Sequence, residues 1–248
     1  MNAAVLPRLP EAVLRASRPE ARWAIYFAPA TSAALWHFGS HWLGRDAATG
    51  VEFSTPSVPG LGAEDVSAIT AAPRRYGFHA TLKAPFRLAP DTSPADLFTA
   101  CGSFAQQHRA FSLGVLVVRS ISGFLALMPE TAPTTLAQFA FGCVQALDRL
   151  RAPAPEAERL RREQAGLTPR QREMLDTWGY PYVDEEFRFH MTLTDRLDDR
   201  SKGFVLPELQ RRYAALDLGA VVLDGIGLFV EPEPGAPFTM VHRFALQP

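Results

Sequence analysis

The sequence predicts an α+β fold in which two pseudo-symmetric αβ lobes, with mostly antiparallel sheets, form a shared central cleft. Three observations predict this fold. Short aromatic and β-branched runs alternate with segments whose apolar residues recur at helical spacing. Both halves of the chain follow the same order of elements: strand, helix, His-bearing strand, helix, strand. One short string also occurs twice, as YGFHATLKAPF and as FRFHMTLTDRL, which indicates an internal repeat.

The first predicted lobe covers about residues 22–121 and follows a leader at 1–21. Turn residues and helix caps bound its elements. In order, these are a strand at 22–29, a helix at 31–44 that begins at Thr31 or Ser32 and ends at Gly44, a polar loop or flap at 45–73, a His-bearing strand from Tyr76 to Pro85, a helix at 93–109 and a strand at 111–121. The clearest helix start is Ser93, because Ser caps first-turn N–H groups and Pro94 suits the first helical position.

The second predicted lobe covers about residues 123–246 and contains an insertion at about 149–182. A turn at Ser122-Gly123 joins two adjacent antiparallel strands. The elements in order are a strand at 123–129, a helix at 134–150, a polar Arg-rich segment at 149–172, a His-bearing strand at 186–197, a helix at 204–217, and strands at 220–232 and 237–247. Because no linker separates the lobes, we expect residues 1–248 to form a single bilobal domain.

Composition narrows the function classes. The 248 residues are 47% hydrophobic, which allows a large core, and the net formal charge is −1. That charge supplies no overall positive field, so long nucleic acid is not an expected partner, whereas a small anionic substrate needs only a local pocket. No apolar run reaches the roughly 18 residues of a membrane span. With only Cys101 and Cys143 and no signal-peptide core, the expected location is the cytoplasm. Composition does not indicate an oligomeric state.

Strand periodicity divides each copy of the repeated string into two faces, because successive side chains point to opposite sides. One face carries Arg75, His79, Thr81 and Lys83 in the first copy, and Arg188, His190, Thr192 and Thr194 in the second. The opposite faces are apolar, and Tyr76 is predicted to point away from the cleft unless a bulge intervenes. Imidazoles, hydroxyls and cations on one face suit an anion-binding cleft.

Paired histidines suit phosphodiester cleavage. An imidazole titrates near a pKa of about 6.5, so His79 and His190 can hold different protonation states near neutral pH. One can act as the base for an attacking hydroxyl and the other as the acid for the departing oxygen. Hydroxyls from Thr81 and Thr192 can donate to the phosphate oxygens. Such a site needs no metal and no cofactor.

The strings His79-Ala-Thr81-Leu82 and His190-Met-Thr192-Leu193 resemble the paired His-x-Thr/Ser-hydrophobic signatures of the 2H phosphoesterase superfamily. The resemblance spans roughly residues 22–246. It implies a fold of two pseudo-symmetric αβ lobes. It also implies a metal-free reaction that opens or forms 2′,3′-cyclic phosphates or cleaves related phosphodiesters. In that reaction the two histidines would have the acid–base roles and the two threonines would bind phosphate. The longer strings RRYGFHATLKAPF, and WGYPYV followed by FRFHMTLT, are similar to the DUF1045-like branch found with bacterial phosphonate-utilisation proteins. That branch implies a small substrate, such as a cyclic phosphate of ribose.

Each assignment has a structural alternative. A single strand histidine is commonly a packing residue, and Thr is common in strands on β-propensity alone. Lys83, Arg75 and Arg188 are predicted to bind phosphate from strand periodicity, but each could face solvent instead. His37 and His41 lie four residues apart, yet no acidic or Cys partner supports a metal site there.

Further alternatives concern function. The aromatic stretch 178–182 could steer the chain or act as a lid, and the Arg-rich segment 149–172 could be a solvated insertion or reach a second phosphate. The same cleft could bind a phosphorylated or phosphonate metabolite without turnover, as a carrier or regulator. RNA end-processing is a third hypothesis, which the charge balance disfavours. The sequence leaves open which histidine is the base, the direction of the reaction and the physiological substrate.

Overall fold

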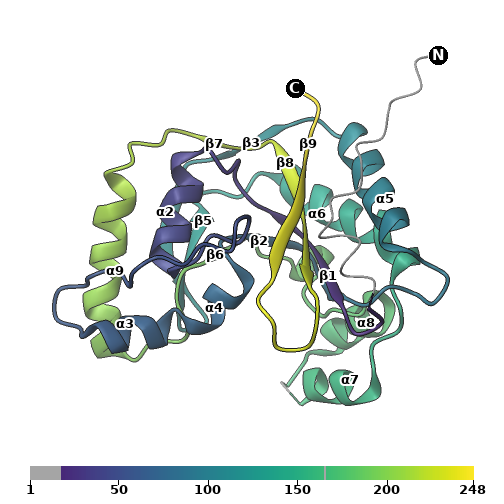
Figure 1. Ribbon diagram of the computed structural model, residues 1–248, viewed down its shortest axis with the longest axis horizontal. Coiled ribbons are helices and arrows are strands. Elements are labelled where there is room, and N and C mark those ends of the chain that lie inside the picture. The colour runs from purple at the N-terminus through teal and green to yellow at the C-terminus, as the bar shows by residue number, and fades with distance from the viewer. Residues whose placement is uncertain (1–17, 165) are drawn as a thin grey trace.

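A computed structural model describes residues 18–164 and 166–248, and residues 1–17 of the expected leader lie outside them. The described chain contains a seven-stranded sheet in the order β4-β5-β6-β2-β1-β8-β9, in which every neighbouring pair is antiparallel (Figure 1). The strands are β1 (Arg22–Phe27), β2 (Ala80–Phe86), β3 (Phe111–Gly114), β4 (Leu116–Ile121), β5 (Phe124–Pro129), β6 (Met191–Thr192), β7 (Val221–Leu223), β8 (Gly225–Glu231) and β9 (Thr239–Ala245). Strands β3 and β7 form a separate two-stranded sheet. The α+β class predicted from the sequence is confirmed.

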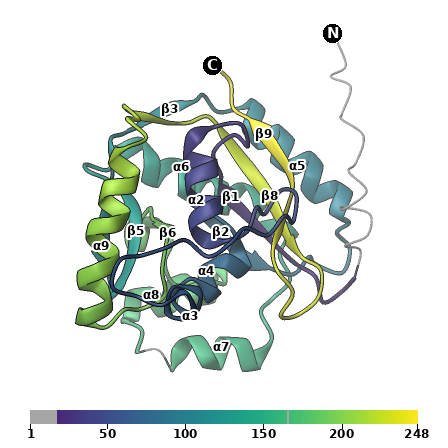
Figure 2. The same ribbon diagram turned by 60° about the vertical axis from the view of Figure 1, so that its left-hand side comes forward.

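Helices pack around the large sheet. They are α2 (Ala34–Leu43), α3 (Ala63–Ile69), α4 (Ala71–Tyr76), α5 (Pro94–Gln106), α6 (Thr134–Leu147), α7 (Glu156–Glu163), α8 (Pro169–Trp178) and α9 (Asp199–Ala214), with short 3₁₀ turns at Asp148–Leu150 and Asp184–Glu186. Figure 1 shows α3 and α4 on one side of the β8–β9 hairpin and α7 and α8 on the other, and Figure 2 shows all four helices at the same end of the molecule. None of the helices in the described residues is both long and apolar enough to cross a bilayer.

Strands from the two predicted lobes are interleaved in the sheet. β1 and β2, from the first lobe, join β8 and β9, from the second. β4, from the end of the first lobe, pairs with β5 across a turn in which Ser122 and Gly123 both have positive φ, as tight hairpin turns require. Each half of the sheet therefore contains strands from both halves of the chain.

The apolar face of the sheet packs on α5, α6 and α9 in one continuous core. Both Leu82 and Leu193 of the repeated string lie in this core, as do Ala80 and Met191 at the centre of each copy. Cys101 and Cys143 are buried free thiols on the covering helices α5 and α6. Because these residues fill the core side, the alternate residues of the same strands are left for the opposite face.

Several element boundaries follow the sequence signals. Ser93 caps α5: its hydroxyl accepts from the Asp96 N–H at 3.2 Å, and Pro94 is the first helical residue. Gly44 ends α2 in the left-handed conformation that favours glycine. The predicted start of that helix is wrong, however, because its N-cap is Ala33, which has no side chain able to cap it.

Other predicted elements differ. The 45–73 loop is wrong in its second part, because α3 and α4 occupy residues 63–76. The predicted strand 111–121 is divided at Gly114, whose φ is 72°, and its two parts join different sheets. The predicted strand 186–197 is reduced to the two residues of β6. The Arg-rich segment contains α7, which has no buried residue, and the start of α8.

Candidate active site

Adjacent strands bring the two His-x-Thr strings together. β2 pairs antiparallel with β6 through Ala80 and Met191. Continuing this register by one residue in each direction places His79 opposite Thr192 and Thr81 opposite His190. All four alternate with the buried pair, so they lie on the open face of the sheet. Each histidine thus faces the threonine of the other copy, in a local two-fold arrangement.

Both imidazoles are oriented by the same local hydrogen bond. Nδ1 of His79 donates to the Gly77 carbonyl at 2.8 Å, and Nδ1 of His190 donates to the Arg188 carbonyl at 2.6 Å. In each copy the acceptor is two residues before the histidine. A neutral imidazole that donates from Nδ1 carries its lone pair on Nε2. At His79 this Nε2 lies 3.3 Å from Thr81 Oγ1, so the first string presents a basic nitrogen beside a hydroxyl.

Burial keeps the two imidazoles neutral. Desolvation lowers the pKa of His79 from 6.5 to about 4, partly opposed by the Gly77 carbonyl, and nearby His190 lowers it further. The Tyr26 ring stacks on His79 with a centroid separation of 3.8 Å, which excludes water from one face of the imidazole. Desolvation also lowers the pKa of His190, against the Arg188 carbonyl.

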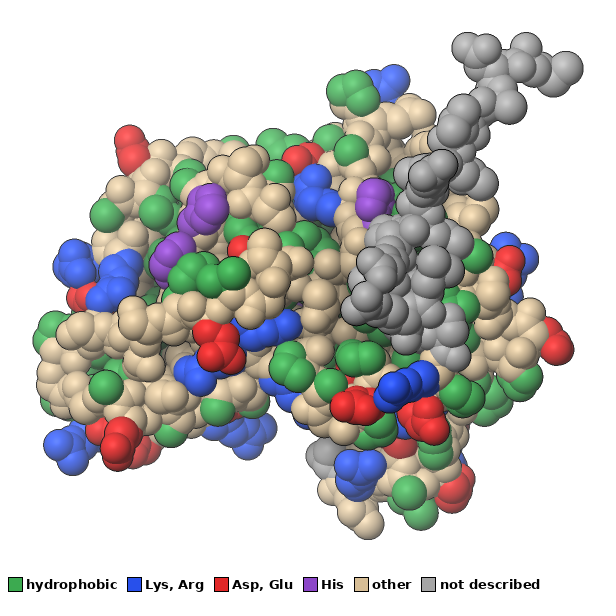
Figure 3. Space-filling view, viewed as in Figure 1, with side chains coloured by type: hydrophobic (Ala, Val, Ile, Leu, Met, Phe, Trp, Pro, Cys, Tyr) green, Lys and Arg blue, Asp and Glu red, His purple; other side chains and the backbone are tan. Residues whose placement is uncertain are grey.

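Two cavities meet between the histidines, at Thr81, Ala84 and Tyr180. One, of about 320 Å³, is the His79 cavity, and its other lining residues include Arg22, Tyr26, Tyr76, Arg162, Thr192 and Asp195. The second, of about 440 Å³, is the His190 cavity, and its other lining residues include Phe124, Gln171, Tyr182, Arg188 and Arg196. In the space-filling view the outline is notched between the part that carries α3 and α4 and the part that carries α7 (Figure 3). Both cavities have the size of a small-ligand site.

The prediction that Lys83 faces the cleft is wrong. β1 residues Ile25 and Tyr26 pair with Lys83 and Thr81 respectively, so β2 has one extra residue, Leu82, at this point. Such a β-bulge interrupts the alternation of side chains. Lys83 is therefore turned to the core side, 3% exposed, where its Nζ lies 3.0 Å from Asp148 and 3.3 Å from the carbonyl of Val144 on α6.

Arg75 and Tyr76 are also placed differently from the prediction, because residues 71–76 form helix α4 and strand periodicity does not apply to them. The guanidinium of Arg75 forms an ion pair with buried Glu231 and donates from Nε to the Ala236 carbonyl at 3.3 Å. Tyr76, predicted to point away, lines the His79 cavity with its ring 6.2 Å from that of His79.

The other two residues predicted on the cleft face of the second copy, Arg188 and Thr194, differ in position. Arg188 lines the His190 cavity, and its Nη1 donates to the carbonyls of Glu185 and Phe187 at 2.7 and 2.8 Å. Thr194 does not reach the cleft: it is 1% exposed, and its hydroxyl accepts from the Leu125 N–H at 2.9 Å.

Sequence reasoning missed several lining residues. Arg22 and Tyr26 reach the cleft because β1 lies next to β2, and no local pattern in the sequence gives that neighbour. Arg162 and Tyr180 belong to the Arg-rich segment and the aromatic stretch, for which a substrate contact was one of the alternatives. Tyr180 lines both cavities, and burial raises its pKa to about 12.

No group of three or more His, Cys, Asp or Glu side chains in residues 18–164 and 166–248 is placed to hold a metal ion. The spaced pair on α2 makes other contacts. His41 Nδ1 donates to the His37 carbonyl at 2.8 Å, and the His41 ring stacks on Phe53 at 4.0 Å.

Residues 81–239 match a family described as "Protein of unknown function (DUF1045)". The chain belongs to this family. Membership in the DUF1045 family confirms the narrower of the two resemblances drawn from the repeated strings.

Two curated relatives match most of the chain. Both are named ribose 1,5-bisphosphate phosphokinase PhnN. The protein of Janthinobacterium sp. (strain Marseille) is 39% identical over 226 residues, which cover 90% of this chain and 50% of that protein. The protein of Laribacter hongkongensis is 41% identical over 221 residues, which cover 88% and 50%. The chain thus spans about half the length of the curated relatives it matches.

The solved structures that match this chain are more distant in sequence. E. coli LigT complexed with 3′-AMP has 15% identity and a TM-score of 0.41, over 92% of this chain and 99% of that one. TT0787 of Thermus thermophilus has 16% identity and a TM-score of 0.43, over 91% and 98%.

Proposed function

We propose that the chain is a metal-independent phosphodiesterase that hydrolyses a small cyclic phosphate or a related phosphodiester by His/His acid–base catalysis. The observation that carries the proposal is the pairing of Ala80 with Met191. This single register places two histidines and two threonines on one open face, with both imidazoles presenting Nε2. A base and an acid held at fixed positions are what displacement at phosphorus requires.

The different surroundings support different roles. His79 is the base, because its low pKa keeps Nε2 unprotonated and able to take a proton from the attacking water. His190 is the acid, because a bound phosphate anion beside it favours the imidazolium form. The water oxygen bonds to phosphorus, the bond to the leaving oxygen breaks, and that oxygen receives the proton of His190. Exchange with solvent then returns both imidazoles to their starting states.

The threonines hold the phosphate. Thr81 lies where the two cavities meet and Thr192 lines the His79 cavity, so their hydroxyls can donate to the two non-bridging oxygens. Negative charge on these oxygens must be stabilised as the displacement proceeds. Arg188, at the His190 cavity, adds positive charge on the leaving-group side.

The substrate we propose is a phosphorylated pentose or a nucleotide of similar size. The cavities fit a ligand of that size. The curated relatives, about twice as long as this chain, are named for ribose 1,5-bisphosphate. The DUF1045-like branch also points to phosphonate utilisation, in which a cyclic phosphate of ribose would be a substrate of the right chemistry.

The test is hydrolysis by the purified full chain in the presence of EDTA. A panel of 2′,3′-cyclic nucleotides and ribose cyclic phosphates is followed by ³¹P NMR. Activity is expected with at least one member, and it is expected to vanish in the His79→Ala/His190→Ala double variant. His37→Ala is the matched control, because this histidine is exposed on α2 and away from both cavities. Activity that survives the double substitution would contradict the site.

A non-catalytic role gives a different result in the same preparation. Saturable binding of a panel member by calorimetry, with no product after long incubation, would favour a carrier or regulatory protein for a phosphorylated or phosphonate metabolite.

A further inference from the structure

We infer that the His79 cavity contains a second anion subsite, formed by Arg22 and Arg162, which binds a phosphomonoester on the same molecule whose phosphodiester lies between the histidines. The inference rests on the proposed function for the position of the reacting diester. It adds a chemical requirement on the substrate: a separate terminal phosphate.

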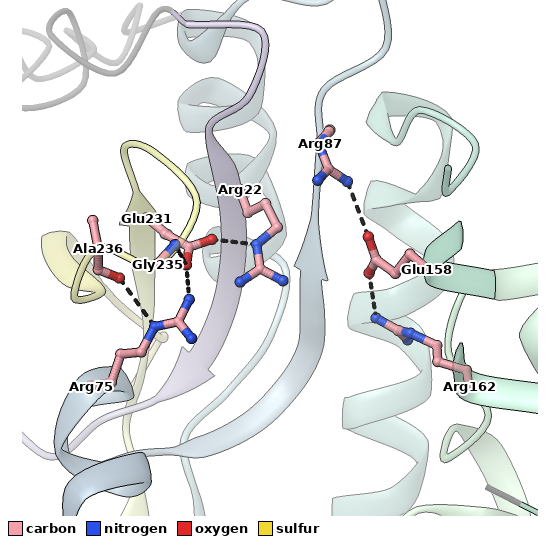
Figure 4. A network of polar contacts seen from close by, with 8 residues as sticks. All are labelled: Arg22, Arg75, Arg87, Glu158, Arg162, Glu231, Gly235 and Ala236. Atoms are coloured by element: carbon pink, nitrogen blue, oxygen red, sulfur yellow. Dashed lines mark hydrogen bonds and ion pairs between the residues drawn. The ribbon is translucent and has the colours of Figure 1, made fainter. Parts of the chain in front are cut away.

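Arg22 is held with its terminal nitrogens available. It is the first residue of β1, four residues before Tyr26, and lies on the same face by alternation. Its Nε forms an ion pair with Glu231, whose side chain is fully buried and which also accepts from Arg75 and from the Gly235 N–H. Neither Nη of Arg22 donates to a residue within the described ranges, and Figure 4 shows both turned away from Glu231. One carboxylate thus fixes two guanidinium groups and leaves positive charge at the cavity.

Arg162 reaches the same cavity from α7 through a similar arrangement. Its Nη2 donates to Glu158 at 2.9 Å and its Nη1 donates to the Gly179 carbonyl at 2.9 Å. Glu158 also accepts from Arg87 at 3.1 Å, so again one carboxylate lies between two arginines (Figure 4). The Arg162 guanidinium lies over the Tyr180 ring, 5.2 Å from its centroid. Arg22 and Arg162, the two basic residues of the described chain that line this cavity, are therefore each held by a carboxylate that also pairs with a second arginine.

The lining favours an anion. Among the described residues that line the His79 cavity, Arg22 and Arg162 oppose one carboxylate, that of Asp195, which accepts from the Ala72 N–H at 3.3 Å. Tyr76 and Tyr180 belong to the same lining, and a tyrosine hydroxyl can donate a hydrogen bond to an anion. Guanidinium groups fixed beforehand lose little side-chain entropy when they bind phosphate, and they bind it by charge-assisted hydrogen bonds.

The spacing separates this subsite from the chemistry. Tyr26 stacks on His79, whereas Arg22 lies four residues back along β1, roughly 13 Å at the rise of a β-strand. This backbone spacing allows a phosphate held by Arg22 and Arg162 to lie in the same cavity as, but apart from, the one proposed between Thr81 and Thr192. The cavity of about 320 Å³ leaves room for one sugar between the two phosphate groups.

The test compares two substrates that differ only in the terminal phosphate: adenosine 2′,3′-cyclic phosphate and its 5′-phosphate. The full chain is expected to favour the 5′-phosphorylated compound in kcat/KM by about 10- to 10²-fold, the effect of one or two hydrogen bonds to a charged group. In Arg22→Met and in Arg162→Met this preference is expected to fall to about one- to threefold, while kcat/KM for the unphosphorylated compound is unchanged. Arg159→Met is the matched control on α7, because Arg159 pairs with Glu156 and Glu163 and lines neither cavity.

The outcomes separate the two proposals. Equal hydrolysis of both compounds by the unmodified chain would overturn the second subsite and leave the proposed function standing. Hydrolysis of neither compound would count against the proposed function, and the subsite is then tested by calorimetry with ribose 5-phosphate. Binding that disappears in Arg22→Met supports the subsite, and binding that is unchanged overturns it. If Arg22→Met does not fold, as judged by circular dichroism, Arg162→Met and Arg22→Lys serve in its place, with Arg22→Lys expected to keep part of the preference.

Discussion

The two copies of the His-x-Thr-Leu string share their local geometry but differ in their surroundings. His79 precedes the seven-residue strand β2, between β1 and β6, and is stacked on Tyr26 at 3.8 Å. His190 precedes the two-residue strand β6, and its ring is tilted against that of Phe124 at a centroid separation of 5.6 Å. In both copies Nδ1 bonds the carbonyl two residues earlier. A local string can therefore fix how a side chain points, whereas its pKa depends on residues brought in from elsewhere.

The largest effect on activity is expected from replacing the histidine of each copy in turn. His79→Asn and His190→Asn should each lower kcat by about 10²- to 10⁴-fold, because each removes one proton transfer. The kcat of the double variant should be only slightly lower than that of the less active single variant, because the two histidines act as a unit.

A leaving group that needs no proton distinguishes the copies. With a p-nitrophenyl phosphodiester, His190→Asn should regain most of its lost activity while His79→Asn should not, because nitrophenolate departs without an acid. If both variants regain activity equally on this substrate, the assignment of His79 as base and His190 as acid is wrong, although both histidines can still belong to the site.

Removing one hydroxyl should have the next largest effect. Thr81→Val and Thr192→Val each lose one donor to the developing charge and should lower kcat by about 10²- to 10³-fold, with the serine variants close to the unmodified chain. Steady-state kinetics on the preferred substrate measures this. A change in KM alone would show that the hydroxyl binds substrate and transition state equally.

Acid stability should depend on His79. Its folded pKa of about 4 lies below the unfolded value of 6.5, so the unfolded chain binds the proton first as the pH falls. The contribution of His79 to the free energy of unfolding is therefore fully present above pH 6.5. It is lost as the pH falls toward 4, and the loss amounts to about 3 kcal/mol. His79→Gln should reduce the difference in unfolding free energy between pH 7 and pH 4 by that amount, measured by urea denaturation. His37→Gln is the exposed control, and an equal change in it would remove the assignment to burial.

The smallest effect is expected from replacing the aromatic rings that pack against the two histidines. Tyr26→Ala opens one face of the His79 ring to water and should raise the pKa of His79 by about one unit, read from an NMR titration of the imidazole protons. Phe124→Ala should act on His190 instead. If Tyr26→Ala leaves the titration of His79 unchanged, the stacked ring does not cause the difference between the copies.

Much of the site could be predicted from the sequence because its signals are local. The His and Thr of each copy are two residues apart, and strand alternation alone puts them on one face opposite the buried Leu82 and Leu193. Ser93 and Gly44 likewise act on the helix ends next to them. The prediction misplaces Arg75 and Tyr76 because it applies strand alternation to residues that form helix α4.

What the sequence by itself determined is the α+β class and two matching strings with their reactive and buried faces. Only the tertiary structure decided which strands are neighbours. The pairing of Ala80 with Met191 joins the strings, the bulge opposite Ile25 and Tyr26 turns Lys83 to the core, and β1 brings Arg22 beside the cleft. Side-chain alternation follows from the backbone of one strand, whereas register and neighbours depend on contacts between residues distant along the chain.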